Sequence, residues 1–148
     1  MNFTNFWTDL QNLEKKIKIT SPGTIKVKAV YWGAPPQAIS DLPAIINALS
    51  ESDRVLGFGS RDQRLRINVQ LLAVKATIDD KKASTIATAL WFAAKDEFDK
   101  DTTIGGEVSF STLRGADPTV PVILTHAGQA YIGFNAYLDI QDVEGFEF

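Results

Sequence analysis

Hydrophobic residues near the start of this chain recur at steps of three and four positions. Such spacing is typical of one face of an amphipathic helix, which we predict over residues 3–17. The apolar face comprises Phe3, Phe6, Trp7, Leu10, Leu13 and Ile17. The positions between them are predicted to face solvent, and they are Asp9, Gln11, Asn12, Glu14, Lys15 and Lys16. The residues Thr20-Ser21-Pro22-Gly23 then end the helix, because proline and glycine disfavour its continuation.

After this helix the spacing changes to two, which predicts β-strands with one buried face. Residues 24–31 form the first predicted strand, which the prolines of Ala34-Pro35-Pro36 end. Residues 42–49 form a short buried strand, with a single helical turn as the alternative. In 64–73 the inward positions are Leu65, Ile67, Val69, Leu71 and Ala73, and the outward ones are Arg64, Arg66, Asn68 and Gln70.

A second helix is predicted to open at Asp79-Asp80, because aspartate accepts hydrogen bonds from the first backbone N–H groups of a helix. It ends before Gly105-Gly106, and its core stripe is Ala83, Ile86, Ala87, Leu90, Ala94 and Phe98. Strands follow at 107–113, with Val108, Phe110 and Thr112 on one face, and at 121–124. In the last strand, 130–141, the inward residues are Ile132, Phe134, Ala136, Leu138 and Ile140, and the outward ones are Tyr131, Asn135, Tyr137, Asp139 and Gln141.

The order of these elements predicts the fold class. Most strands follow one another without a helical crossover, which indicates a largely antiparallel sheet. We therefore predict an α+β fold with the two amphipathic helices packed on one face of the sheet. The 148 residues are expected to form one domain, residues 1–148, without internal repeats.

Composition narrows the classes of function. With 15 basic and 18 acidic residues the formal net charge is −3, so the basic footprint of a nucleic-acid-binding protein is missing. The first residues show no secretion signal, and no apolar run approaches the length that crosses a bilayer, so no membrane association is expected. There is no cysteine, which excludes disulfides and thiolate chemistry.

Residues that could carry catalysis are sparse. His126 is the one histidine, so it has no second histidine for a metal site and no Gly-x-Ser-x-Gly elbow for a hydrolase; we interpret it as a turn residue. The carboxylates Asp96, Glu97, Asp99 and Asp101 lack the spacing of a calcium loop. Gly57-Phe58-Gly59 and Gly105-Gly106 are interpreted as turns. We therefore predict no enzyme activity, no cofactor and no metal.

A charged segment, residues 50–63, is predicted to be a long loop and continues into the basic strand that follows it. The candidate interface residues in this region are Asp53, Arg54, Phe58, Arg61, Asp62, Arg64 and Arg66. They fit ion pairs between subunits, or equally a solvated loop and strand face. A contact with nucleic acid would call for more positive charge and for stacking aromatic rings nearby.

The layout resembles the tail terminator (tail-completion) proteins of long-tailed bacteriophages. The segments that carry the resemblance are the first helix, the strand Ile25 to Tyr31, the proline-containing turn, Leu42 to Ile46, the strand Leu65 to Leu71, the helix through Ile86 to Phe98, and the closing strand Tyr131 to Leu138. Together they cover nearly the whole chain. The family has no catalytic or ligand motif, so the resemblance assigns no role to any single residue.

The resemblance implies a homohexameric ring that caps the head-proximal end of the tail tube, ends its polymerisation and joins the tail to the neck. The implied partners are further copies of the chain, the tail tube protein and the head-tail connector proteins. DNA would pass through the central channel without specific binding. The protein would be made in the host cytoplasm and would reside in the virion neck.

Two other functions compete with this reading. One is a different neck component, a stopper or an adaptor, although small barrels and helical proteins are more usual there. The other is a small-ligand-binding or enzymatic α+β domain whose pocket lies between helices and sheet, lined by Trp7, Trp91 or Phe92. A bound small molecule in the purified protein would favour the latter.

Overall fold

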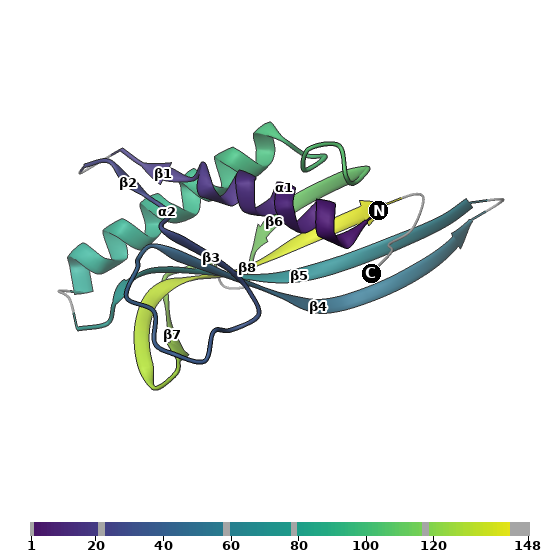
Figure 1. Ribbon diagram of the computed structural model, residues 1–148. Helices are drawn as coiled ribbons and strands as arrows, with labels where there is room; N and C mark the ends of the chain where they lie inside the picture. The colour runs from purple at the N-terminus through teal and green to yellow at the C-terminus, as the bar shows by residue number, and fades with distance from the viewer. Residues whose placement is uncertain (1, 21–22, 58–59, 78–79, 117–118, 143–148) are drawn as a thin grey trace.

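The computed structural model describes residues 2–20, 23–57, 60–77, 80–116 and 119–142, with the backbone alone at 51–57, 60–63, 80 and 142. Two helices lie on the same side of a six-stranded sheet (Figure 1). The helices are α1 (Phe3–Lys15) and α2 (Asp80–Lys100). The sheet contains β3 (Ala29–Trp32), β4 (Ala44–Gly57), β5 (Ser60–Lys75), β6 (Phe110–Gly115), β7 (Val122–His126) and β8 (Gln129–Asp142). The predicted α+β class is confirmed.

The sheet is mostly antiparallel. Its order is β3-β4-β5-β8-β6, and β7 also pairs with β8. β3 runs parallel to β4, whereas the other described pairs of this sheet are antiparallel. β8 is therefore a central strand of the sheet. One of its edges pairs with β5, and the other pairs with β7 near the start of β8 and with β6 near its end.

The alternation predicted for 64–73 and 130–141 places most of the core correctly, with Tyr131 as an exception. The inward residues of β5 and β8 are buried with the helices in one cluster, whereas Arg66, Asn68, Asn135, Tyr137 and Asp139 stay partly exposed on the opposite face. Successive side chains of a strand point to opposite faces, so a period of two in the sequence reads directly as inside and outside. We call the face away from the helices the outer face.

α1 begins at Asn2, whose side chain accepts a hydrogen bond from the backbone N–H of Asn5 at 3.2 Å. Such a cap satisfies one of the free donors of the first helical turn. Phe6, Leu10 and Leu13 are buried as predicted. Phe3 and Trp7 pack edge-on against Trp32 of β3, with ring centroids 5.0 and 5.5 Å apart, which fixes α1 over this side of the sheet.

One residue of α1 contradicts its predicted exposure. Glu14 was assigned to the solvent face, but its side chain is 0% exposed. Asn47 of β4 donates from Nδ2 to Glu14 Oε1 at 2.7 Å, and the same nitrogen donates to the carbonyl oxygen of Tyr31 at 3.2 Å. Helical periodicity places Glu14 at the border of the apolar stripe, and the approach of β3 and β4 covers that border.

α2 packs its small residues against the sheet. Ala83, Ala87 and Ala94 are buried together with Ile86, Leu90 and Phe98, as the sequence predicts. Trp91 is also buried and stacks on Phe134 of β8, with ring centroids 5.6 Å apart. Phe92, the next residue, is 66% exposed. Of the three aromatic residues proposed to line a ligand pocket, Trp7 and Trp91 are therefore used in packing and Phe92 points outward.

A second, smaller cluster of buried residues lies on the outer face, where the segment 33–43 crosses it (Figure 1). It contains Ile39, Ala44, Ile46, Leu72 and Tyr131. Tyr131 was predicted to face solvent, and this is wrong, because its side chain is 0% exposed. Its hydroxyl accepts a hydrogen bond from the backbone N–H of Ile39 at 2.8 Å and lies 3.2 Å from the carbonyl oxygen of the same residue.

Tyr131→Phe is expected to lower the free energy of unfolding by about 1–2 kcal/mol, because the buried backbone groups of Ile39 lose their partner. Urea unfolding would measure this change. Tyr137→Phe is the matched control, since Tyr137 lies half-buried on the open part of the outer face. Equal losses for the two variants would show that the hydroxyl of Tyr131 does not hold the crossing segment.

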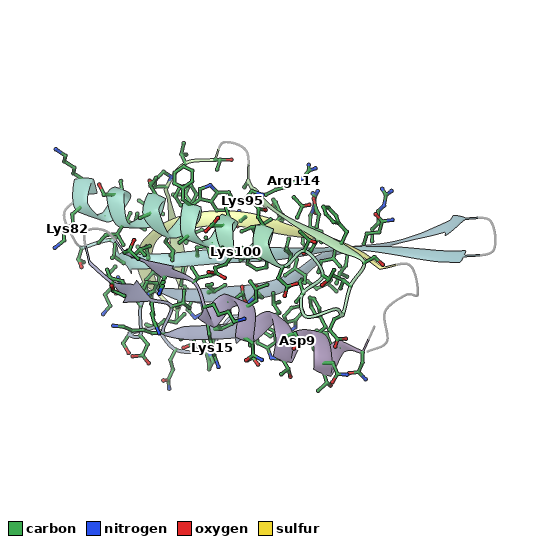
Figure 2. All side chains as sticks on the ribbon, turned by 90° about the horizontal axis from the view of Figure 1, so that it is seen from above. Asp9, Lys15, Lys82, Lys95, Lys100 and Arg114 are labelled. Carbon is green, nitrogen blue, oxygen red and sulfur yellow. The ribbon has the colours of Figure 1, made fainter. Side chains whose placement is uncertain are left out.

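The predicted loop at 50–63 is wrong. β4 and β5 continue through it as one hairpin, in register from Glu51 opposite Arg66 to Gly57 opposite Ser60. Beyond Gln63, which pairs with Asp142, the described register of β8 ends. The described residues of this region, 50–57 and 60–63, therefore form two paired strands that extend past both helices (Figures 1 and 2), and we call them the hairpin arm.

Two strand boundaries also differ from the prediction. The segment 24–31 is divided between β2 (Ile25–Lys26), which pairs with β1 (Lys18–Ile19), and β3. The strand predicted at 107–113 begins later, at Phe110 of β6, and its buried and exposed faces are the reverse of the prediction. Ser111 and Leu113 are buried, whereas Phe110 is 52% exposed. Ser111 can face inward because its hydroxyl donates to the carbonyl oxygen of Thr102 at 3.0 Å.

Candidate functional site

The part of the outer face that the crossing segment leaves open carries a groove of about 400 Å³. It lies over the ends of β5, β8 and β6, next to the root of the hairpin arm. We call it the arginine groove; its residues are Arg64, Leu65, Arg66, Phe110, Thr112, Arg114, Asp139, Ile140 and Gln141. Strand register brings them together, because Arg66 lies opposite Asp139, and Thr112 lies opposite Asp139 on the other side.

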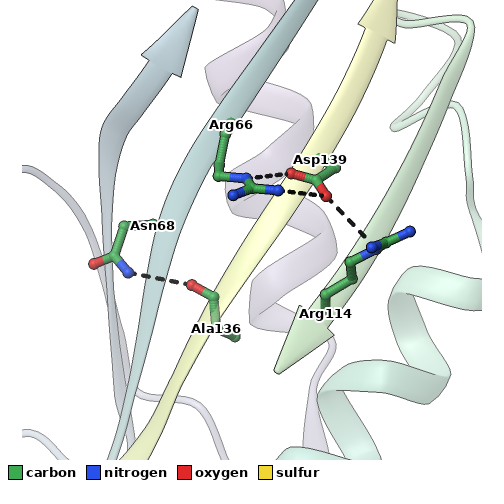
Figure 3. A network of polar contacts seen from close by, with 5 residues as sticks. All are labelled: Arg66, Asn68, Arg114, Ala136 and Asp139. Carbon is green, nitrogen blue, oxygen red and sulfur yellow. Dashed lines mark hydrogen bonds and ion pairs between the residues drawn. The ribbon is translucent and has the colours of Figure 1, made fainter. Parts of the chain in front are cut away.

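Asp139 lies between two of the arginines (Figure 3). Its Oδ1 accepts a hydrogen bond from Nε of Arg66 at 2.7 Å, and its Oδ2 accepts one from Nη2 of the same side chain at 3.3 Å. Nε of Arg114 lies 3.6 Å from Oδ2. The Arg66 contact is bidentate, which orients the guanidinium and the carboxylate relative to each other. Both are partly exposed, so solvent screens the pair and its contribution to stability is small.

The same face is ordered further along β5 and β8. The guanidinium of Arg66 lies over the ring of Tyr137, 5.0 Å from its centroid. Asn68 donates from Nδ2 to Asn135 Oδ1 at 2.7 Å. The same nitrogen donates to the carbonyl oxygen of Ala136 at 3.2 Å (Figure 3). Arg66 is thus held from two sides, by a carboxylate and by an aromatic ring.

The arginine groove has the charge of an anion-binding surface. Three guanidinium groups and one carboxylate line it, so three positive charges less one negative leave a net charge of +2. Phe110 adds an exposed apolar ring at its edge, and the side chain of Arg114 is 68% exposed. This combination of arginine and an exposed aromatic ring is enriched at protein interfaces.

The structure brings some of the predicted interface residues into this site. Arg64 and Arg66 lie in the arginine groove. Asp53, Arg54, Arg61 and Asp62 belong to the hairpin arm, where Asp53 is in register with Arg64 of the same chain. Phe58 lies outside the described residues.

Sequence reasoning missed Arg114 and Phe110 as members of the site, and it recognised Asp139 only as an outward-facing position. Phe110 and Arg114 lie on β6, about fifty residues away from Arg64 along the chain. Their approach depends on the pairing of both β5 and β6 with β8. The signal available in the sequence was the alternation in the 107–113 region, which was assigned the wrong inward face.

The described residues offer little for catalysis. No group of three or more His, Asp or Glu side chains among them could hold a metal ion. His126 ends β7 and lies beside a turn, as predicted, with Nε2 3.2 Å from the carbonyl oxygen of Gln37. Within the same part of the chain, no helix has the length and apolar character needed to cross a membrane.

Comparison with known protein families gives no match for this chain, and comparison with curated proteins gives none either.

Proposed function

We propose that this chain is a ring-forming structural subunit of the tail terminator class, which caps the head-proximal end of a phage tail tube and joins it to the neck. The observation that carries the proposal is the hairpin arm, together with the order of elements that resembles this class. The arm is built from β4 and β5 and extends beyond the helices and the rest of the sheet (Figure 2).

A two-stranded ribbon has little stability of its own in water, because it has no sheet or helix to pack on. The edges of its strands also expose backbone groups that can pair with another chain. One edge of β4 pairs with β5, and the other edge pairs with β3 from Ala44 to Asn47. In the described register, this second edge has no strand partner from Ala48 onward. Contact with a neighbouring subunit would stabilise this long ladder.

Ring closure requires heterologous contacts, in which one patch of a subunit meets a different patch of the next. The hairpin arm and the arginine groove supply two separate patches on one chain. The proposed partners are copies of this chain, the tail tube protein and the head-tail connector proteins. The net charge of −3 suits a channel through which DNA passes without being held.

The test is the solution mass of the purified chain by light scattering over a range of concentrations, together with negative-stain images. We expect a closed oligomer with a central opening. In the matched variant, Asn-Gly replaces residues 54–63, which keeps Asp53 opposite Arg64 and closes the hairpin with a favourable two-residue turn.

The shortened variant is expected to stay monomeric and to unfold at nearly the same urea concentration as the full chain, because the buried residues that the structure describes lie outside the arm. A shortened chain that assembles like the full one would remove the arm from the proposal. A full chain that forms only a two-fold symmetric dimer would contradict the ring.

A further inference from the structure

A second groove lies at the end of β5 that is farthest from the hairpin arm, between this strand, the first turns of α2 and the segment 33–43 (Figure 1 shows these elements). Its volume is about 410 Å³, and we call it the lysine groove. Of the ten described residues that line it, two are lysines, two carry hydroxyl groups and six are apolar. The apolar ones are Ile25, Leu42, Pro43, Ala73, Val74 and Ile86.

The lysine groove is positively charged. Its two lysines, Lys28 and Lys75, are exposed, and neither forms an ion pair with another described residue. No carboxylate is among the described residues that line the groove, so its charge is +2. The charged residues next to its segments along the chain balance one another, because three are lysines and three are aspartates: Lys26, Lys81 and Lys82 against Asp41, Asp79 and Asp80. The groove therefore keeps its own positive charge.

The groove also borders a strand edge. The described pairing of β4 with β5 ends where Ala44 lies opposite Leu72, so in this register the edge of β5 toward β4 has no strand partner from Ala73 to Lys75. Backbone groups at such an edge can pair with an extended segment of another chain. Positive charge, an apolar lining and an open edge together suit an extended peptide with acidic and apolar side chains.

From this combination we infer that the lysine groove of one copy binds residues 143–148 of the neighbouring copy. This segment has the sequence Val-Glu-Gly-Phe-Glu-Phe. Its charge is −2, from Glu144 and Glu147, which matches the two lysines of the groove. Phe146 and Phe148 supply apolar side chains for the apolar lining, and removing such rings from water favours binding. The inference rests on the proposed ring and names one contact within it.

The segment is too short to reach the groove of its own chain. Asp142, which precedes it, lies opposite Gln63 at the root of the hairpin arm, whereas Lys75 lies opposite Tyr131 near the other end of β8. At about 3.3 Å per residue, the stretch of β8 from Tyr131 to Asp142 is roughly 35 Å long. Phe146 follows Asp142 by four residues, which reach at most about 14 Å.

The contact must therefore join different copies. It links two different parts of the chain, the groove at one end of the sheet and the segment that follows β8 at the other. Such a head-to-tail contact repeats from copy to copy and closes into a ring when the rotation between copies allows it.

Binding of the segment can be measured apart from ring formation. A fluorescent peptide with the sequence of residues 141–148 is titrated with a chain that ends at Asp142, and fluorescence anisotropy follows the binding. This shortened chain keeps every buried residue that the structure describes. We expect saturable binding that weakens at least about tenfold when the chain carries Lys28→Glu and Lys75→Glu, because like charges then meet. Phe146→Ala with Phe148→Ala in the peptide should weaken binding by a similar factor.

The matched control is Lys15→Glu with Lys16→Glu. These two lysines are exposed at the end of α1 and do not line the groove, so the same change of net charge is made elsewhere. Peptide binding should then stay within about twofold of the unmodified value, since the charges at the groove are intact. Circular dichroism would show that each variant is folded.

Charge reversal with rescue tests the contact in the full chain. One variant carries Lys28→Glu and Lys75→Glu, and the other carries Glu144→Lys and Glu147→Lys. Each alone places like charges in every contact, so we expect the concentration for half-assembly to rise about tenfold. Mixed in equal amounts, the two variants can alternate around the ring with every contact complementary. The mixture, and a chain with all four changes, should assemble again.

The outcomes separate this contact from the ring itself. A peptide that does not bind, or that binds the Lys28→Glu and Lys75→Glu chain as tightly as the unmodified one, would overturn the contact and leave the ring standing. A peptide that binds as expected to a chain that stays monomeric at every concentration would support the occupant of the groove and overturn the ring. Decanoate that binds through the two lysines where the peptide does not would assign the groove to a small anionic amphiphile and overturn the contact.

Discussion

Glu14→Gln is expected to leave the protein stable at neutral pH and to abolish a loss of stability that the unmodified chain shows as the pH rises toward 8. Glu14 is fully buried beneath β3 and β4, and desolvation raises the pKa of its carboxyl to about 8 although the hydrogen bond from Asn47 opposes the shift. At neutral pH the carboxyl is therefore protonated.

The unpaired atoms around Glu14 fit the protonated form. Asn47 Nδ2 bonds to Glu14 Oε1, but Glu14 Oε2 and Asn47 Oδ1 have no partner among the described residues. When Glu14 is protonated on Oε2, this oxygen is a hydrogen-bond donor. Asn47 Oδ1, the other atom without a partner, is an acceptor. A hydrogen bond from Oε2 to Asn47 Oδ1 would then give both atoms a partner. Glutamine has the same donor and acceptor and does not titrate, so it can replace the protonated acid.

The sign of the pH dependence follows from linkage. The pKa of Glu14 is about 8 in the folded chain and 4.5 for an exposed carboxyl, so between these values the folded state holds a proton that the unfolded state has released. The stability contributed by this proton is fully present below pH 4.5, falls by about 1.4 kcal/mol per pH unit above it, and is lost as the pH passes 8.

Urea unfolding between pH 5 and pH 9 would measure this effect. We expect the difference in unfolding free energy between Glu14→Gln and the unmodified chain to grow with pH up to about 8 and then to level off. Glu107→Gln is the control, because it makes the same acid-to-amide change away from Glu14 and Asn47. The unfolding free energy of this variant should change with pH in parallel with that of the unmodified chain. If Glu14→Gln loses stability with pH as steeply as the unmodified chain does, another group is responsible.

Gly133→Ala is expected to destabilise the protein by about 3 kcal/mol or more, a large share of the stability of a domain of this size. Gly133 is buried in β8, in register with both Leu72 of β5 and Val122 of β7. A methyl group at Gly133 would overlap the backbone carbonyl oxygen of Leu71. A backbone atom in a ladder cannot rotate away as a side chain does, so the β5–β8 pairing would have to open.

The site explains why glycine is needed. The register of β5 and β8 shifts between Leu72 and Val74, so the strands carry a β-bulge beside Gly133. Glycine in a strand often marks such a close approach of two backbones. Gly23→Ala is the matched control, because Gly23 has open space around it, and it should change the urea midpoint little. A loss below about 1 kcal/mol for Gly133→Ala would show that the strands accommodate the methyl group by a small shift.

The sequence alone determined the two helices, the inner face of β5 and most of the inner face of β8. In these elements one side is buried by the chain's own core, so burial imposes a period of 3.6 or 2 that can be read directly. It also predicted that the region of Arg64 and Arg66 forms a charged surface, and these two residues do lie together in the arginine groove. The reason is local, since strand alternation places both on one face.

The tertiary structure alone decided the features that depend on distant segments. The hairpin arm has a charged, loop-like sequence without a regular alternation of polar and apolar residues, so no pattern marked it as a strand; only the pairing of β4 with β5 shows it. Glu14 and Tyr131 are polar residues at positions that a helix or a strand would expose. They are buried because β3 and β4 in one case and the segment 33–43 in the other fold over them and supply hydrogen bonds. Arg114 and Asp139 join Arg66 only through strand pairing, a long-range contact that no local pattern encodes.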